Sequence, residues 1–154
     1  MCKYVTNLVD TVAIPDVIPT DDITQPERTV TSVLVQWKVP IYYNAPVTNY
    51  SLNLCQKISD DCIPVSGYPM NISVGQYTNG SIVRYGLLLV TVDVVICSYL
   101  HRYNISGLQP FSSSPYSLSI RAINDIGSAN FSSPVTLTLV NRSEIVLVSL
   151  CVSS

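Results

Sequence analysis

Residues 103–124 read YNISGLQPFSSSPYSLSIRAIN, and the second half of this stretch alternates between apolar and polar side chains. From position 116 onward, Tyr, Leu, Ile and Ala share one face of an extended chain, while two Ser and one Arg occupy the other. A period of two predicts a β-strand with one buried and one solvated face. Tyr103 and Ile105 alternate in the same way before Gly107. The stretch therefore predicts a short strand at 103–106 and a longer one at 116–124.

The same alternation recurs on both sides of this segment, whereas apolar residues at helical spacing are nearly absent. It predicts strands at 31–38, 47–56 and 134–140, and one or two further strands within 81–100. Residues 57–80 hold several Pro and Gly with little alternation, and we expect an elaborated connection there. Because each strand has one apolar face, the chain is predicted to be all-β, with two sheets stacked face to face as a β-sandwich.

The composition favours one folded domain. The chain has 154 residues, of which 47% are hydrophobic and 12% are charged. This length is typical of a single domain, and the low charge with high hydrophobic content excludes a disordered chain. The net charge is −2 and no basic cluster is present, which argues against nucleic acid as a partner.

No segment has the pattern of a complete transmembrane helix. The longest charge-free stretch, 62–83, contains Pro, Gly and Asn, and the apolar run 86–97 is short and carries Asp93. The apolar residues 145–152 could be a last strand or the truncated start of a membrane segment. The N-terminus lacks the apolar core of a signal peptide. We therefore expect either a cytosolic protein or a piece of a longer one, which could be membrane-anchored.

Acceptor triplets for N-linked glycans are more frequent than chance predicts. Six Asn-X-Ser triplets occur, where about 2 are expected from the Asn, Ser and Thr content. They begin at Asn49, Asn71, Asn79, Asn104, Asn130 and Asn141. Asn49 lies inside a predicted strand and is the weakest acceptor, so the other five are the glycosylation candidates. The excess favours a secreted or cell-surface glycoprotein, although Asn and Ser are also common in turns.

The five cysteines point to a disulfide rather than a metal site. They are Cys2, Cys55, Cys62, Cys97 and Cys151, with no C-x-x-C pair and a single His in the chain. A turn-forming Ser59-Asp60-Asp61 separates Cys55 from Cys62, so a local disulfide is predicted there, worth about 2–3 kcal/mol. The alternative is that all five are buried free thiols. An odd count leaves at least one unpaired within the chain, and the pairing of the other three stays open.

Several of these segments together resemble the fibronectin type III domain. The stretches 103–110 and 116–124, with Gly127 and Ser133-Pro134-Val135, are similar to its E–F–G region. Trp37, with Pro40 and Tyr50 after it, is similar to its B and C strands, so the resemblance covers about 24–140. It implies an immunoglobulin-like two-sheet β-sandwich.

The resemblance also implies structural roles for single residues. Leu108 and Pro110 followed by Tyr116 match a tyrosine corner, in which the hydroxyl bonds to nearby backbone. Trp37 is expected at the centre of the core. The expected core positions are Trp37, Tyr50, Leu108, Tyr116 and Ala122.

The sequence departs from the family pattern in three places. Eight residues, rather than six, separate Leu108 from the corner Tyr116, and Ala129 replaces a loop Gly. The connection from the C to the E strand is elongated by roughly 25 residues relative to a domain of about 100. We therefore expect a linker or edge segment at 1–22, a domain at 23–141 with an insertion at about 57–80, and a tail at 142–154.

No catalytic, cofactor-binding or metal-binding constellation is evident. His101 is the only His and is expected on the surface beside Arg102. The acidic pairs Asp21-Asp22 and Asp60-Asp61 are neighbours, and on an extended chain their side chains point apart. A Gly-rich phosphate loop is also missing. These observations predict a protein that is not an enzyme and needs no cofactor.

The family resemblance implies a spacer or protein-binding module of an extracellular adhesion or receptor protein. The predicted contact surface is the loop of Asp125, Ile126, Gly127 and Ser128, with the insertion and the tyrosines at 42, 43, 68 and 77. The alternative for these tyrosines, which we favour, is that they cover the edge of the core. Neither Arg-Gly-Asp nor a Trp-Ser-x-Trp-Ser box occurs, so the usual markers of integrin ligands and cytokine receptors are missing. The alternatives are an accessory sandwich of a secreted enzyme and an intracellular structural module.

Overall fold

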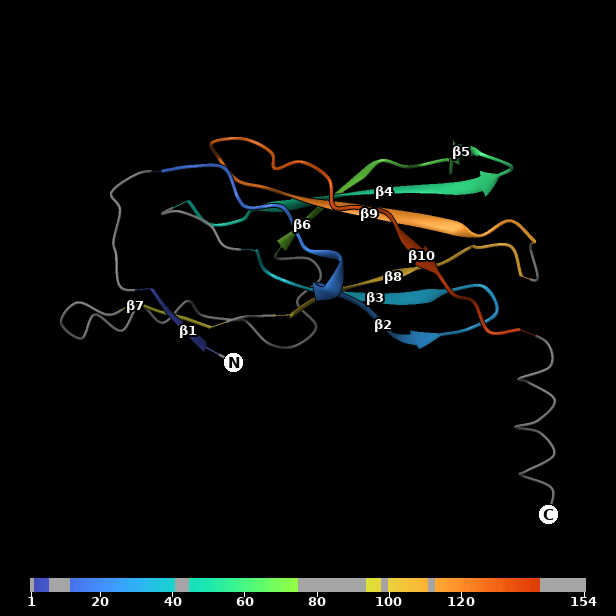
Figure 1. Cartoon of the computed structure of the whole chain (residues 1–154), viewed down its shortest axis with the longest axis horizontal. Coiled ribbons are helices and arrows are strands. Elements are labelled where there is room, and N and C mark those ends of the chain that lie inside the picture. The colour runs from blue at the N-terminus through green and yellow to red at the C-terminus, as the bar shows by residue number, and fades with distance from the viewer. Residues whose placement is uncertain are drawn as a thin grey trace, which may run out of the picture.

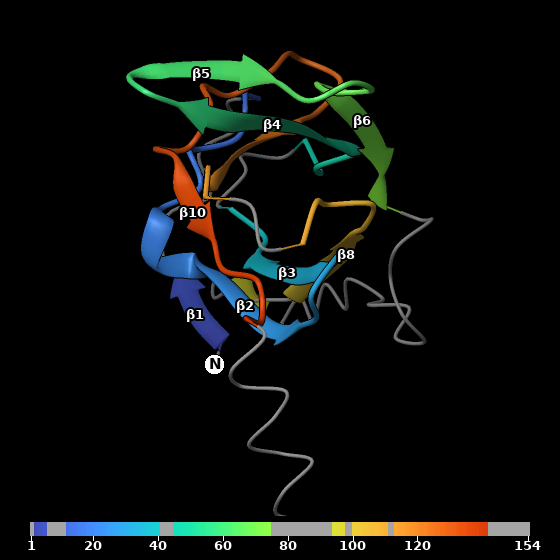
Figure 2. The same ribbon diagram turned by 90° about the vertical axis from the view of Figure 1, so that its right-hand side faces the viewer.

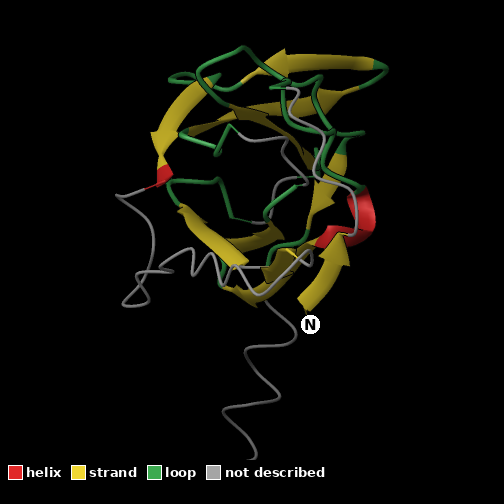
Figure 3. Cartoon of the chain, turned by 90° about the vertical axis from the view of Figure 1, so that its left-hand side faces the viewer, coloured by secondary structure: helices red, strands yellow, loops and turns green. Residues whose placement is uncertain are grey.

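The computed structural model describes residues 2–5, 12–40, 45–74, 94–97, 100–110 and 113–141. Strands make up nearly all of their regular structure, and helix is confined to short 3-10 turns such as η1 (Thr20–Asp22) (Figures 1 and 3). Two antiparallel sheets lie face to face, one above the other in Figure 2. The expected all-β two-sheet sandwich is therefore confirmed.

The first sheet contains three strands in the order β2 (Ile23–Arg28), β3 (Val33–Lys38) and β8 (Leu100–Ile105). Its central strand β3 alternates strictly, and its inward residues Val33, Val35 and Trp37 are fully buried. β2 is an edge strand with a register shift between Thr24 and Glu27, a stretch that contains Pro26. Pro cannot donate a ladder hydrogen bond, and an irregular edge strand tolerates it.

The second sheet is built around β4 (Asn49–Ile58), the longest described strand. β9 (Tyr116–Ile123) pairs along one side of it, and β10 (Val135–Leu137) follows β9. On the other side β4 pairs with β5 (Asp61–Pro64) and β6 (Met70–Ser73). β4 is thus a central strand, paired on both sides over most of its length, and its residues Tyr50, Leu52 and Leu54 are among the most buried of the described residues.

The stretch predicted as an elaborated connection at 57–80 contains the two strands β5 and β6. A tight turn at Ser59 and Asp60 folds the chain back along β4, and Ser59 adopts the left-handed conformation with φ of 58°. Little alternation was visible in the sequence because β5 is exposed on both faces. Residues 75–80 lie outside the described part.

A third, two-stranded sheet consists of β1 (Cys2–Val5) and β7 (Val94–Cys97). β7 lies within the region 81–100 in which further strands were expected, and β8 begins at its end. The predicted short strand at 103–106 is the second half of β8. Residues 142–154, the predicted tail, lie outside the described part.

The core lies between the two large sheets. Trp37 is 0% exposed and meets the ring of Tyr50 edge-on, with the centroids 5.1 Å apart. Leu108, Tyr116 and Ala122 are also buried. The hydroxyl of Tyr116 accepts a hydrogen bond from the backbone N–H of Gln109 at 3.1 Å, so this ring is buried while its polar end is satisfied.

Candidate functional site

The loop at 124–128 forms one end of the sandwich, where β9 ends beside the start of β4. The register places Ile123 opposite Asn49 of β4, and an isolated bridge joins Ile123 to Ser128. The backbone N–H of Asn124 donates to the carbonyl of Gly127 at 3.0 Å, so the loop closes on itself. Asp125 and Ile126 at its tip are exposed, with Ile126 at 54%. The loop is thus a short, closed projection with an apolar tip.

Asn124 organises this loop through its buried side chain. Its Oδ1 accepts hydrogen bonds from the backbone N–H groups of Ile126 at 3.0 Å and Gly127 at 3.1 Å. Its Nδ2 donates to the carbonyls of Ala13 at 2.8 Å and Ala45 at 3.1 Å. One amide therefore holds three segments together, because Asn carries both donors and acceptors.

The sequence reasoning missed Asn124 as a site residue. Asn next to a loop that contains Gly is a signal for an Asx-turn, in which the side chain bonds to backbone N–H groups further along the chain. That signal was present in Asn124-Asp125-Ile126-Gly127. The two donated bonds could not be read from it, because their acceptors lie far away in the sequence.

An exposed apolar patch borders the same loop. Ile126 is accompanied by Val12 and Ile14, which are also exposed large hydrophobic residues. Gly127 lets the N-terminal segment approach closely, since a Cβ at this position would lie 3.0 Å from Cγ2 of Ile14. The patch therefore combines the loop with a segment that precedes the first sheet. Isolated exposed apolar side chains are ordinary, but a group of them at one end of a domain suits protein contacts.

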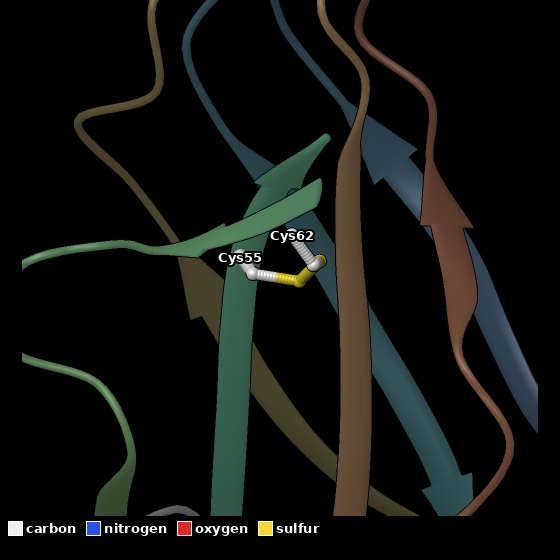
Figure 4. The surroundings of a disulfide bond; sticks show 2 residues. All are labelled: Cys55 and Cys62. Carbon is white, nitrogen blue, oxygen red and sulfur yellow. A yellow bond between two sulfur atoms is a disulfide. The ribbon is translucent and has the colours of Figure 1, made fainter. Parts of the chain in front are cut away.

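A disulfide between Cys55 and Cys62 crosslinks β4 and β5 (Figure 4). It lies at the other end of β4 from the 124–128 loop, because Cys55 pairs with Ser117 at the start of β9 and the loop follows the end of β9. The two Cα atoms are 5.4 Å apart, and seven positions separate the two residues in the sequence. Cys62 lies on the exposed strand β5, so the bridge is on the surface rather than in the core.

Four of the five glycan-acceptor candidates lie in the described part, and all four are exposed. Asn71 is on β6, Asn104 on β8, Asn130 after the 124–128 loop and Asn141 after β10. Asn79 is outside the described residues. Asn49, the weak sixth triplet, lies in β4, where it is paired to Ile123 on one side and Ser73 on the other.

His101 is buried, and the prediction that it lies on the surface is wrong. It is 6% exposed and stacks near Trp37, with ring centroids 6.4 Å apart, and lies 5.1 Å from the ring of Tyr50. The register pairs His101 with Trp37, and its side chain shares the inward face of β8 with Ile105. Its neighbour Arg102 suggested a surface position, but alternation puts adjacent residues on opposite faces.

Burial at this position lowers the pKa of His101 below its ordinary value of 6.5, because desolvation disfavours the imidazolium. The unfolded chain then binds the proton more tightly than the folded one. We therefore expect stability to be constant above about pH 6.5 and to fall as the pH drops below it. Urea unfolding from about pH 8 to about pH 5 measures this slope. In His101→Phe the slope over this range should vanish, and its persistence would contradict the assignment.

Of the four tyrosines predicted as contact residues, only Tyr68 is in the described part. It is half-buried, and burial together with Tyr103 raises its pKa to about 12. The hydroxyl of Tyr103 contacts the sulfur of Met70 at 3.4 Å. Tyr68 thus packs at the edge of the core between the two sheets rather than projecting into solvent.

The described residues contain no cluster of three or more His, Cys, Asp or Glu side chains that could hold a metal ion. A groove of about 400 Å³ runs beside β10, between residues 113–116 and 136–141. Ser, Thr, Pro, Leu and Val side chains dominate its lining, together with Tyr116 and Asn141. The lining contains no His, Asp, Glu, Lys or Cys, which are common general acids and bases. Within the same part of the chain, no helix is long and apolar enough to cross a membrane.

Comparisons with known proteins identify the same fold. The chain is similar to the twitchin kinase region from C. elegans, with 16% identity and a TM-score of 0.52. The likeness covers 86% of this chain but only 18% of that one. The fourth FNIII domain of a human protein is similar at 13% identity and a TM-score of 0.51, over 90% of each chain.

The sixth fibronectin type III domain of human fibronectin type III domain containing protein 3 has 19% identity, a TM-score of 0.48, and coverage of 85% and 91%. The comparison with curated protein sequences found no match. The profile of the fibronectin type III domain matches residues 18–138, which is most of the chain. The two sheets, the buried Trp37 and the Tyr116 corner agree with this match, and the chain belongs to the fibronectin type III domain family.

Proposed function

We propose that this chain is a non-catalytic, extracellular fibronectin type III module of a larger adhesion or receptor protein. It spaces neighbouring domains or binds a protein partner. The domain spans 23–141, with 1–22 as a linker or edge segment and 142–154 as a tail. The observation that carries the proposal is the exposure of every described glycan-acceptor candidate, each in a different segment of the chain.

The acceptor positions suit glycans that leave the core undisturbed. Asn71 and Asn104 project from strands of different sheets, and Asn130 and Asn141 lie in segments outside the strands. A glycan is bulky and must point into solvent, so only exposed asparagines can carry one in the folded protein. Glycans on these faces supply the solvation that charged side chains provide in most domains, and only 12% of this chain is charged.

The disulfide supports an oxidising compartment. Cys62 lies on an exposed edge strand, within reach of thiol reductants. Glutathione and thioredoxin keep such thiols reduced in the cytosol, whereas disulfides persist in the secretory route and outside the cell. A surface bridge across a hairpin therefore favours the extracellular assignment over the intracellular one.

The contact surface of the proposed module is the 124–128 loop with Val12 and Ile14. Because Asn124 fixes the loop through four hydrogen bonds, little conformational entropy is lost when a partner binds its tip. Exposed Ile126 supplies apolar area for a contact, and Asp125 beside it supplies a charge. Binding modules commonly present rigid loops of this kind at the end of a β-sandwich.

Secretion of the chain from a eukaryotic host tests the compartment. We expect glycosidase treatment to lower the mass of the secreted protein, and Asn→Gln changes at positions 71, 104, 130 and 141 each to remove one glycan. Asn49→Gln is the matched control and should leave the glycan mass unchanged, because Asn49 is held between two strands. Absence of a mass shift at all six triplets would count against the extracellular function and favour an intracellular module.

A further inference from the structure

The register of the small third sheet places two cysteines opposite each other. In the antiparallel pair of β1 and β7, Cys2 is the partner of Cys97, and the register continues without a break to Val5 and Val94. From this register we propose that Cys2 and Cys97 form a second disulfide. It joins the first described strand of the chain to the strand that precedes β8.

Directly opposed residues of an antiparallel pair meet the backbone requirement for a disulfide. Their Cα atoms are separated by about 4.5 Å or about 5.5 Å, depending on whether the pair is hydrogen-bonded. Disulfides usually span Cα separations of about 4.4–6.8 Å. Opposed residues also share one face of the sheet. The register therefore puts Cys2 and Cys97 at backbone positions between which a disulfide can form.

The proposed disulfide would stabilise a sheet that has only two strands. β1 and β7 pair only with each other among the described strands, and a two-stranded ribbon is marginally stable in water by itself. A disulfide across the ribbon would hold the two strands together. This proposal rests on the proposed function, because the disulfide forms only in an oxidising compartment. Two thiols lose two protons and two electrons, and the disulfide of a dithiol–disulfide oxidoreductase accepts them and becomes a dithiol.

With a second bridge, four of the five cysteines are paired. Cys55 is joined to Cys62, and the proposed bond uses Cys2 and Cys97, so one cysteine of the five remains, Cys151. It lies outside the described part of the chain. The proposal therefore predicts one free thiol per chain in the oxidised protein, or none if Cys151 pairs with a thiol of another molecule.

Tryptic mapping without reduction separates the alternatives cleanly, because Lys and Arg divide the five cysteines among five peptides. They are 1–3, 39–57, 58–84, 85–102 and 143–154. The protein is secreted, its free thiols are alkylated in denaturant, and the digest is analysed by mass spectrometry. We expect peptide 1–3 to be linked to 85–102 and peptide 39–57 to 58–84. Reduction should release all four.

Other linkages overturn the proposal in distinguishable ways. A bond from Cys151 to Cys2 or to Cys97 rejects it, as does alkylation of both while Cys55 and Cys62 stay linked. Either result leaves the extracellular function standing. Alkylation of all five cysteines rejects the second disulfide and the oxidising compartment together.

Thermal unfolding provides an independent measurement. Cys2→Ala, Cys97→Ala and the double variant should lower Tm by the same amount, because each removes the same bond. Cys151→Ala is the matched control and should leave Tm unchanged. A double variant that loses clearly more than either single variant would contradict a shared bond.

Discussion

Replacing Trp37 by alanine is expected to lower the free energy of unfolding by about 3–5 kcal/mol, the range for truncating a large buried aromatic side chain. Trp37 is 0% exposed and lies at the centre of the core, against the rings of Tyr50 and His101. Its Nε1 has no hydrogen-bond partner among the described residues. The expected loss of unfolding free energy therefore comes from the lost apolar burial and from the cavity left behind, and no hydrogen bond contributes to it.

Denaturant unfolding followed by far-UV circular dichroism measures this effect without relying on the fluorescence of Trp37. Lys38→Ala, at the next position of the same strand, is the matched control. Its ion pair with Asp22 has a 2.7 Å separation but is exposed, and such pairs contribute about 0–1 kcal/mol. If Trp37→Ala does not fold, Trp37→Phe should fold with a smaller loss. A loss in Trp37→Ala no larger than that in Lys38→Ala would refute the central role of Trp37.

Replacing Asn124 by alanine is expected to cost about 2–4 kcal/mol, since each of four lost hydrogen bonds contributes about 1 kcal/mol net. The change leaves the carbonyls of Ala13 and Ala45 without their donor, and the N–H groups of Ile126 and Gly127 without their acceptor. Part of this network is buried, so water does not fully replace the lost bonds. The loop and the N-terminal segment should loosen together.

Hydrogen exchange adds a local readout to the unfolding measurement. In Asn124→Ala the amides of Ile126 and Gly127 should exchange faster, because their acceptor is gone. Asp125→Ala is the control at the adjacent, exposed position and should change neither stability nor exchange appreciably. Unchanged exchange at both amides in Asn124→Ala would show that the side chain does not fix the loop. The rigidity of the loop would then no longer support the proposed contact surface.

Much of the fold was predictable because alternation is a local property of a strand. The pattern in 116–124 marks which residues of β9 face inward, and Tyr116, Leu118, Ile120 and Ala122 are all buried. Ser117 on the other face is buried as well, whereas Ser119 and Arg121 are partly exposed. Strand β3 is similar, with Trp37 on its buried face. The hairpin of β4 and β5 escaped this reasoning, since an edge strand exposed on both faces has no apolar period to detect.

The candidate site was only partly predictable for the same physical reason. The loop from Asp125 to Ser128 could be identified from turn residues, but its organiser Asn124 acts on carbonyls supplied by distant segments. His101 has the same alternation as Tyr103 and Ile105, which indicates an inward position. Its charged neighbour Arg102 led instead to the prediction of a surface position. The burial of His101 against Trp37 follows from the pairing of β3 with β8, which brings the two residues opposite each other.

By itself, the sequence determined that the chain is an all-β sandwich with an apolar and a polar face on most strands. Side-chain period is set by neighbours along the chain, so it can be read without the fold. Only the tertiary structure decided which segments meet. It placed Asn124 between Ala13 and Ala45, His101 against Trp37, and Cys2 opposite Cys97. Strand pairing joins residues that are remote in sequence, and a local pattern does not tell which distant strand a given strand pairs with.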